Sequence, residues 1–530
     1  MRFGLPSTHA EVVGLTALVV VAALARLPYL WSIPLFTDET ADSLRSFAIY
    51  EGRQLPLTNV AHYVGAFHNY LEAAGFWVFG PSIYTPRLLV WLLGALTVAA
   101  TYLLAREMLG RPAAWLAAGL LATSGVHVGG NSHVAWSQCA APLWLALTCA
   151  LLHRAVHTGS GRSLLGAGFA GGLALQSHPT VFAFLLGAGV YLFWCGRALM
   201  RTRWPYLAAG LFLLAYSNMV WFNLTTGFES IRSARSRDAA YGEDRDRDVG
   251  SYLVSQGRIL TTLPRLPAGA VDARPDGEGS DAARPYLTDP LVLAYAGLTL
   301  FGVVLLARGG NPLPGLVIVS ALLLFPLFGA RHDILPRQGR YLAPLLPLLF
   351  TALAAGAWSF SRGVGSWLAR RGVSPTALGG LGLVAAGLLV LLPLVPLQRY
   401  YAQSVADGQT NDRFFALLAE IEANRPNGEF VVLDFQLAQE SLGGGGTPLR
   451  TLHYMLTLRG IPHTDLTLEP ERVARRYGNG GVVVVLAEKT YRSVGAQLAL
   501  EPPPGRGSLA PPSPYGVYRL GPARVGGTGG

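Results

Sequence analysis

Residues 87–105 read RLLVWLLGALTVAATYLLA, an apolar run that opens with one arginine and is followed by another, Arg106. A helix that spans a bilayer needs roughly 20 mostly apolar residues, so this run predicts a membrane-spanning helix. Further stretches of the same character are residues 11–30, 112–127, 135–153, 163–176, 180–196, 205–222, 288–307, 313–329, 341–360 and 376–397. The sequence therefore predicts an α-helical polytopic membrane protein with about eleven transmembrane helices.

The composition agrees with a chain that lies mostly in lipid. Of its 530 residues, 51% are hydrophobic and only 14% are charged, whereas a soluble domain carries roughly 25% charged residues. The charges concentrate in residues 223–286 and 401–530, which leaves too few elsewhere for a water-facing surface. This excludes a soluble enzyme, a coiled coil, collagen and a disordered chain. Three cysteines in apolar stretches give no disulfide framework.

The arginines predict the orientation, because cytoplasmic turns carry an excess of positive charge. With the N-terminus inside, the alternate turns that face the cytoplasm are basic, as at Arg106 with Arg111 and at Arg154 with Arg162. We read the net charge of +10 in this way and not as a sign of nucleic acid. The same threading places residues 31–86, 223–286, 330–340 and the tail from about residue 398 outside the cytoplasm.

Two domains follow from this threading. Residues 1–400 form the transmembrane domain, in which residues 31–86 are the first outer loop and residues 223–286 a polar outer loop. In the first outer loop, Asp42–Tyr50 and Gly65–Phe79 have the spacing of helices that lie along the interface. Residues 401–530 are predicted to form an extracytoplasmic α/β domain with a disordered Pro/Gly-rich end. Its elements are a helix at Asp412–Asn424 and strands at Phe430–Asp434 and Val482–Leu486.

The residues best suited to catalysis are two adjacent carboxylates, Asp38 and Glu39, which follow the first span and an apolar run. A carboxylate held at the boundary of a membrane domain can act as a general base towards a hydroxyl or an amine. We predict that Asp38 is the base and that Glu39 is its neighbour or orients the acceptor. The alternative is a pair of solvated surface charges.

Several motifs in this order resemble a known family, the GT-C class of integral-membrane glycosyltransferases. Within that class the closer likeness is to the bacterial branch of protein O-mannosyltransferases and aminoarabinose transferases. The likeness covers about residues 10–400. It rests on the acidic pair and on Phe79-Gly80-Pro81-Ser82 with Arg87, Leu103-Leu104-Ala105-Arg106 with Gly110-Arg111, Gly172–Pro179, and Arg340-Tyr341-Leu342-Ala343-Pro344-Leu345-Leu346-Pro347.

The resemblance implies a transferase of the bacterial inner membrane. Such enzymes move a hexose or pentose from a polyprenyl-phosphate donor to an extracytoplasmic acceptor, a lipid, glycan or protein hydroxyl, with inversion. The implied partners are the lipid-linked donor, membrane lipids and the acceptor, without nucleic acid. The donor is already activated, so no nucleotide site is needed, and the sequence has no P-loop.

The donor phosphate needs cations, and residues 331–340 supply three arginines on the outer side, where topology requires none. The guanidinium fork matches the geometry of a phosphate. We therefore predict a donor-phosphate site made by Arg331, Arg337, Arg340 and Tyr341. The alternative is that these arginines extend to lipid headgroups.

The predicted substrate-binding residues are His62, Tyr63, His178 and Arg87, although a histidine that only packs is as good a reading of His62 and His178. The spacing of the histidines gives no metal-binding pattern, so we expect no cofactor and no metal. A divalent ion at Asp38 and Glu39 is the alternative, since acidic pairs hold one in oligosaccharyltransferases of the same class.

A transporter or lipid flippase without transferase activity is the competing function. Transporters usually contain repeats with broken helices in corresponding places and a substrate site at the midplane. This sequence has no internal repeat, and its polar residues gather at one membrane face. Both features favour the enzyme.

Overall fold

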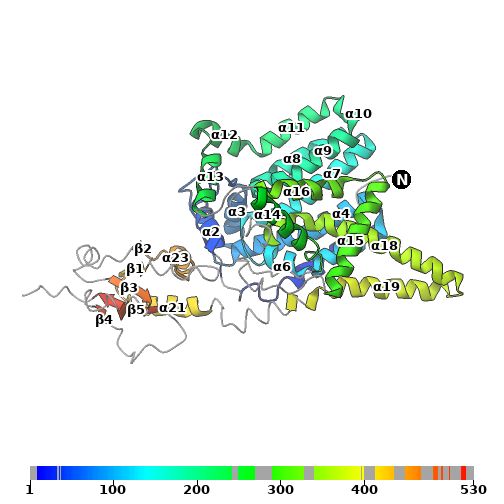
Figure 1. Ribbon diagram of the computed structural model, residues 1–530. Coiled ribbons are helices and arrows are strands. Elements are labelled where there is room, and N and C mark those ends of the chain that lie inside the picture. The colour runs from blue at the N-terminus through cyan, green and yellow to red at the C-terminus, as the bar shows by residue number, and fades with distance from the viewer. Residues whose placement is uncertain are drawn as a thin grey trace, which may run out of the picture.

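The computed structural model describes residues 9–32, 35, 37–241, 249–268, 289–327, 339–395, 397–398, 412–434, 448–466, 482–487, 491–492, 500–501 and 515–520. These residues form a helical bundle and, at one end of it, a small sheet built from the tail (Figure 1).

The helices of the first half are α1 (His9–Ala25), α2 (Thr37–Tyr50), α3 (Phe67–Phe79), α4 (Thr85–Leu109), α5 (Arg111–Thr123), α6 (Gly125–Ser132), α7 (Ala141–Thr158), α8 (Gly161–Ser177), α9 (Phe182–Cys195), α10 (Arg197–Met200), α11 (Trp204–Ala215), α12 (Ser217–Thr226), α13 (Glu229–Tyr241) and α14 (Val249–Thr262). Those that follow are α15 (Pro290–Arg308), α16 (Leu313–Leu324), α17 (Gly339–Leu342), α18 (Leu346–Arg370), α19 (Pro375–Leu391), α21 (Asp412–Ala423) and α23 (Pro448–Leu458).

Local sequence signals explain where these helices begin. Proline stands in the first turn of α4, α5 and α7, where a missing backbone N–H removes no helical hydrogen bond. Asp289 caps α15 by accepting hydrogen bonds from the backbone N–H groups of Leu291 and Val292. Ser160 caps α8 in the same way, through the N–H of Ser163.

Within the described residues each predicted span overlaps a helix, and the prediction of a polytopic helical membrane protein is confirmed. Among the described residues, 4 helices are long and apolar enough to cross a membrane, namely Thr85–Leu109, Ser137–Thr158, Pro290–Arg308 and Ala343–Arg370. The number rises to 6 if two bent pairs each count as one span: Arg111–Thr123 with Gly125–Ser132, bent by 59°, and Trp204–Ala215 with Ser217–Thr226, bent by 68°. The count of eleven stays a prediction.

Small residues bring two of the long helices into direct contact. Gly302 of α15 and Gly356 of α18 face the partner helix so closely that a Cβ atom at either position would overlap a backbone carbonyl. The overlapped carbonyls belong to Ala352 and Leu298, respectively. Close approach of backbones at small residues is a general way of packing helices in membranes. These two helices therefore leave no room for a third component along their contact.

The polar outer loop at residues 223–286 contains more structure than its sequence predicted. It carries α13 and α14, and α14 buries Ser255, Ile259 and Thr262 against the bundle. The first outer loop contains α2 and α3, close to the predicted ranges, with the rings of Phe47 and Phe76 packed edge to face at 6.1 Å.

The described part of the tail forms a five-stranded sheet in the order β2-β1-β3-β5-β4. Its strands are β1 (Phe430–Asp434), β2 (His463–Leu466), β3 (Val482–Ala487), β4 (Leu500–Glu501) and β5 (Tyr515–Leu520). β1 pairs in parallel with β2 and β3, whereas β5 runs antiparallel to β3 and β4. The two predicted strands correspond to β1 and β3.

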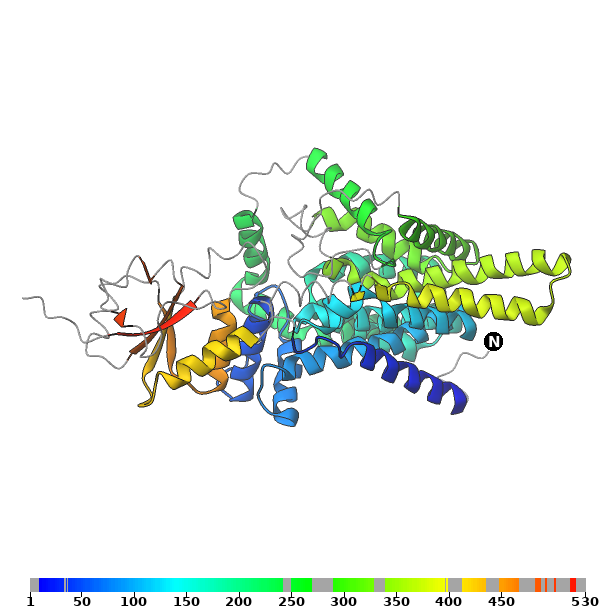
Figure 2. The ribbon, with the colours of Figure 1, turned by 90° about the horizontal axis from the view of Figure 1, so that it is seen from below.

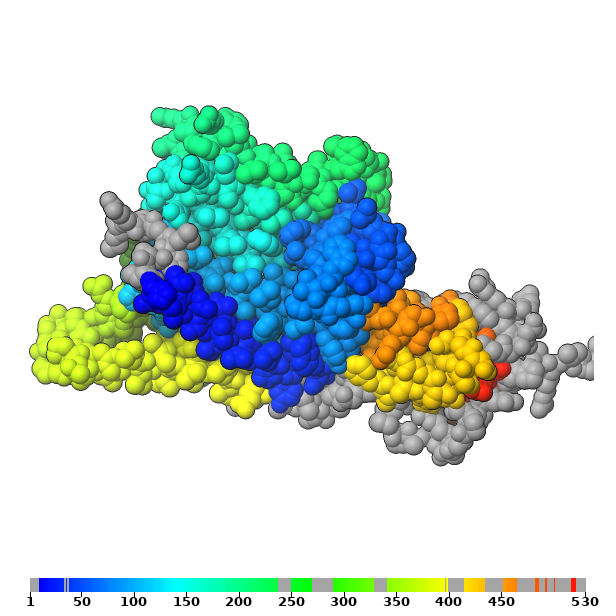
Figure 3. Space-filling view, turned by 180° about the vertical axis from the view of Figure 1, so that it is seen from behind, coloured from blue at the N-terminus to red at the C-terminus, as the bar shows by residue number. Residues whose placement is uncertain are grey.

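The tail packs against one end of the bundle, beside α2. Leu35 and Ile83 share one apolar core with Phe414 and Leu417 of α21 and Leu452 of α23. Figure 2 shows the tail at one end of the molecule, whereas the α18–α19 hairpin projects from the other. The space-filling view in Figure 3 shows α21 and α23 directly against the segment that contains α2 and α3.

Candidate functional site

The acidic pair lies in the first turn of α2, and its two members have different surroundings. Asp38 is exposed, whereas Glu39 is buried with only 1% of its surface exposed. A negative charge at a helix N-terminus is stabilised by the unpaired backbone N–H groups there. Asp38 is thus exposed at one end of the bundle, whereas Glu39 points inward.

Glu39 forms a buried ion pair with Arg87, in the first turn of α4. Arg87 Nε donates to Glu39 Oε1 at 2.7 Å and Arg87 Nη2 donates to Oε2 at 3.0 Å. The backbone N–H of Ala135 also donates to Glu39, and Arg87 Nη1 donates to the carbonyl of Leu30. These contacts fix the first turn of α2 on the bundle, so Glu39 and Arg87 hold Asp38 in place. Direct contact of Arg87 with substrate stays a prediction.

A second polar cluster lies one turn further along α2, between α2 and α3. The hydroxyl of Ser46 donates to Glu72 Oε2 at 2.6 Å, and His68 Nε2 lies 3.1 Å from Glu72 Oε1. The amide of Asn69 donates to the carbonyl of Asp42 at 3.0 Å. Asp42, His68 and Glu72 are all buried, so this cluster places three titratable groups in the interior of the first outer segment.

Burial raises the pKa of Asp42 to about 7, and the negative charges of Glu72 and Asp38 act in the same direction. A hydrogen bond from Asn59 and the proximity of His68 oppose the shift but do not cancel it. Low-dielectric surroundings disfavour the charged form of a carboxyl group. Near neutral pH, Asp42 is therefore divided between its protonated and ionised forms.

The stability of the folded chain should depend on pH through Asp42. Folding raises the pKa from 3.8 to about 7, so between these values the folded chain holds a proton that the unfolded chain releases. The contribution to stability is fully present below pH 3.8 and is lost as the pH rises through about 7. Thermal unfolding of the protein in detergent across this window should show the trend, and Asp42→Asn should remove it.

The control for this prediction is Asp289→Asn, at the exposed N-cap of α15, which should leave the pH trend of the parent protein in place. A trend that is equally steep in Asp42→Asn and in the parent would contradict the assignment.

The structure brings together Tyr63, His178 and Tyr341, three predicted site residues from distant parts of the sequence. The ring of His178 lies 6.2 Å from the ring of Tyr63 and 5.3 Å from that of Tyr341. His178 precedes the short 3-10 turn Pro179–Val181, and its Nδ1 lies 2.8 Å from the hydroxyl of Thr180. The ring of His62, the residue before Tyr63, lies 5.7 Å from a different side chain, that of Phe222.

The loop that carries Tyr63 is fixed to α8 and α12. The N–H of Gly65 donates to the carbonyl of Gln176 at 3.0 Å, and a Cβ atom on Gly65 would overlap the Gln176 side chain. The amide of Asn218 donates to the carbonyl of Leu57 and to Gln176 Oε1. Tyr63 and His178 are therefore held at a fixed separation.

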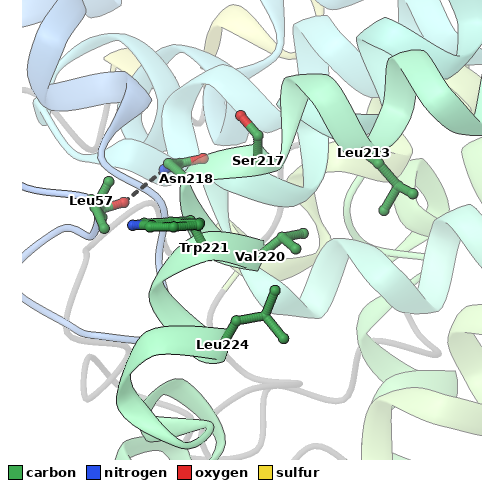
Figure 4. Close-up of a pocket in the computed structure, with 7 residues that line it drawn as sticks. All are labelled: Leu57, Leu213, Ser217, Asn218, Val220, Trp221 and Leu224. Atoms are coloured by element: carbon green, nitrogen blue, oxygen red, sulfur yellow. Dashed lines mark hydrogen bonds between the residues drawn. The ribbon is translucent and has the colours of Figure 1, made fainter.

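A groove of about 510 Å³ lies at the bend between α11 and α12, beside this loop (Figure 4). Its lining is mainly apolar and consists of Leu57, Leu213, Ser217, Asn218, Val220, Trp221 and Leu224. Figure 4 shows the amide of Asn218 pointing to the Leu57 carbonyl. The Asn218 amide in the groove thus holds the loop, and the remaining surface, which is mainly apolar, suits contact with lipid.

The predicted phosphate clamp lies largely outside the described part of the chain. Arg331 and Arg337 fall outside the described residues, and the side chain of Arg340, in the first turn of α17, is not described either. Tyr341 is described and buried. The clamp therefore stays a prediction, anchored at Tyr341.

The described residues contain no group of three or more His, Cys, Asp or Glu placed to hold a metal ion. An ion at Asp38 and Glu39 would have to displace Arg87 from Glu39, so the pair fits an ion poorly. His153 and His157 are four residues apart on α7, a spacing that the sequence analysis did not identify, and their rings lie 4.2 Å apart. Both contact other side chains, His153 the hydroxyl of Tyr191 and His157 the amide of Asn311. Metal independence stays a prediction.

Sequence reasoning missed Asp42, His68 and Glu72. Two spacings could have identified them, because residues four apart in a helix lie on the same face. Asp38 and Asp42 are related in this way on α2, and His68 and Glu72 on α3.

Comparison with known proteins supports the resemblance. Residues 64–221 match the model of a family described as dolichyl-phosphate-mannose-protein mannosyltransferase. No curated protein sequence matches the chain. The fold is similar to the crystal structure of ArnT from Cupriavidus metallidurans in the apo state, with 15% identity over 96% of this chain and 98% of that one and a TM-score of 0.59.

Two further structures share this fold. ArnT from the same organism bound to undecaprenyl phosphate matches with 14% identity over 98% of this chain and 99% of that one, at a TM-score of 0.58. The archaeal oligosaccharyltransferase AglB from Archaeoglobus fulgidus, in complex with an inhibitory peptide and a dolichol-phosphate, matches with 14% identity over 92% and 71% of the two chains, at a TM-score of 0.50. The resemblance predicted from the sequence is therefore confirmed: the chain has the fold of the GT-C glycosyltransferases and carries a mannosyltransferase-family match over residues 64–221.

Proposed function

We propose that this protein transfers a sugar from a polyprenyl-phosphate donor to an acceptor hydroxyl outside the cytoplasm. The observation that carries the proposal is the meeting of Tyr63, His178 and Tyr341 at the segment that follows Arg340. It supports a donor site at this place, because an arginine next to hydroxyl and imidazole donors suits a lipid phosphate. The fold supports the same donor class, since the matched structures include one bound to undecaprenyl phosphate and one bound to dolichol-phosphate.

Each group of predicted residues has a different role in the proposed reaction. Asp38 takes the proton of the acceptor hydroxyl, which attacks the anomeric carbon from the face opposite the phosphate, so the configuration is inverted. Arg331, Arg337 and Arg340 with Tyr341 stabilise the negative charge of the departing phosphate. His62, Tyr63 and His178 bind the sugar or the acceptor. The sugar is a hexose or a pentose, and the acceptor is a lipid, a glycan or a protein.

The location follows from the same proposal. The chain is a multi-pass membrane protein, and we place it in the inner membrane of a bacterium with its tail outside the cytoplasm. The basic turns predicted to face the cytoplasm support this orientation. A transporter or flippase is not favoured, because the family match and the matched structures are transferases.

Arg340→Ala should weaken binding of undecaprenyl phosphate by about ten- to a hundredfold, since a hydrogen bond to a charged group contributes roughly 1.5–3 kcal/mol. Arg340→Lys should restore part of the affinity, because a point charge cannot copy bidentate contacts. Binding is measured with a fluorescent undecaprenyl phosphate and the purified protein in detergent.

Arg370→Ala is the matched control, because Arg370 is exposed in the last turn of α18, at the opposite end of the same segment. It should bind the lipid as the parent does. Parental affinity in both Arg340 variants would assign Arg340 to lipid headgroups and would contradict the proposed donor site.

A further inference from the structure

The tail contributes one polar side chain to the interior of the outer segment. Tyr454 lies on α23 and is 1% exposed, although the tail is separated from α2 by most of the chain. Its hydroxyl donates a hydrogen bond to the carbonyl of Ser82 at 3.3 Å. Ser82 belongs to the turn that leads into α4, so Tyr454 links the tail to the element that carries Arg87.

The charges of one member of the acidic pair and of one member of the second polar cluster act on the Tyr454 hydroxyl. Burial raises the pKa of Tyr454 well above its usual value, and the negative charges of Glu72 and Glu39 raise it further. Ser43 of α2 lies near the same hydroxyl. The phenol therefore remains protonated and acts as a hydrogen-bond donor to the carbonyl of Ser82.

Apolar contacts extend this link to the segment before the acidic pair and to the turn before α4. Leu35, three residues before Asp38, is buried in the core that α21 and α23 form with Ile83. The ring of Tyr84 lies 6.3 Å from that of Phe415 of the tail. The first turn of α2 is thus fixed on one side by Arg87 and on the other by the tail.

We propose that Tyr454 is a positioning residue of the transfer centre, through which the tail fixes the first turn of α2 and hence the orientation of Asp38. This inference rests on the proposed function, in which Asp38 is the base. It makes the tail a part of the site, since the site is held in its working geometry only when α23 is docked.

The test is Tyr454→Phe, which keeps the ring and removes only the hydroxyl. We expect kcat to fall by about three- to tenfold, which corresponds to the loss of one ordinary hydrogen bond, with unchanged donor KM and thermal midpoint. Turnover is measured in proteoliposomes with radiolabelled polyprenyl-phosphate mannose as the donor and envelope membranes as the acceptor source. Tyr518→Phe is the matched control, because Tyr518 is also buried in the tail but belongs to a separate core with Leu500.

Three outcomes would overturn the inference. A Tyr454→Phe variant with parental kcat would do so, as would one in which kcat fell only together with the thermal midpoint, since that is the behaviour of a purely structural contact. An equal loss of kcat in Tyr518→Phe would assign the effect to the tail fold in general. Turnover of the parent is measured in the same assay with a polyprenyl-phosphate hexose and a polyprenyl-phosphate pentose, so its absence with both donors would reject the proposed function, whereas parental turnover in Tyr454→Phe rejects only the role of this tyrosine.

Discussion

Asp38→Asn should lower the turnover of lipid-linked sugar by about a hundred- to ten-thousandfold, the range typical for loss of a general base. The amide keeps the size and much of the hydrogen bonding of the carboxylate but cannot accept the proton of the acceptor hydroxyl. Asp38 is exposed, and the buried ion pair of the first turn of α2 belongs to its neighbour Glu39, so the fold should be unaffected. Binding of undecaprenyl phosphate should likewise match that of the parent.

Asp289→Asn is a suitable control for this variant, because Asp289 is also an exposed acid at the start of a helix. It should turn over the donor at the parental rate. If Asp38→Asn did the same, Asp38 would be a solvated surface charge, and the base would have to be sought elsewhere in the outer segment.

The second large effect is expected from Glu39→Gln, which leaves the guanidinium of Arg87 buried without its carboxylate partner. Removing one member of a buried ion pair typically lowers the free energy of unfolding by about 3–5 kcal/mol. Both side chains are almost fully buried, at 0% and 2% exposure, so solvent cannot compensate the remaining charge. Turnover should fall with stability, because the same pair fixes the turn that carries Asp38.

A double variant, Glu39→Leu with Arg87→Met, separates charge from packing. Replacing a whole buried pair by apolar residues is often neutral for stability, so the double variant should unfold closer to the parent than Glu39→Gln does. It should remain poor in turnover.

The exposed pair of Glu51 and Arg53 provides the matched control for this cycle. Glu51→Gln should change the free energy of unfolding by less than about 1 kcal/mol, as is usual for surface ion pairs. Parental stability of Glu39→Gln would show that the Arg87 guanidinium has another counter-charge, and the positioning role of the pair would then be wrong.

The parts of the fold that could be predicted are those that depend on local composition. Apolar runs such as residues 87–105 specify their helices because lipid leaves the backbone no other way to satisfy its hydrogen bonds. The first outer helices and two strands of the tail were also visible as amphipathic or β-branched segments. The helix α14 was missed because it lies in a polar region of the sequence and two of its three buried residues, Ser255 and Thr262, are polar.

The candidate site was only partly predictable, because its key contacts join residues far apart in the sequence. The family resemblance indicated a functional arginine at Arg87 but not that its partner is Glu39, 48 positions earlier. Likewise, Tyr63, His178 and Tyr341 were predicted separately, and only the fold shows that they meet. Asp38 is exposed and Glu39 is buried, and the identities of two adjacent acidic residues do not predict which of them is buried.

The docking of the tail on α2 has a consequence for the order of events during biosynthesis. Leu35 and Ile83 are made within the first hundred residues, but their partners in α21 and α23 begin only at Asp412. Domains fold as the ribosome releases them, starting from the N-terminus, yet this apolar core lacks one half until most of the chain has been synthesised. The segment that bears Asp38 is therefore among the first to be inserted and among the last to reach its final packing, so a nascent chain that stops before the tail cannot close this core.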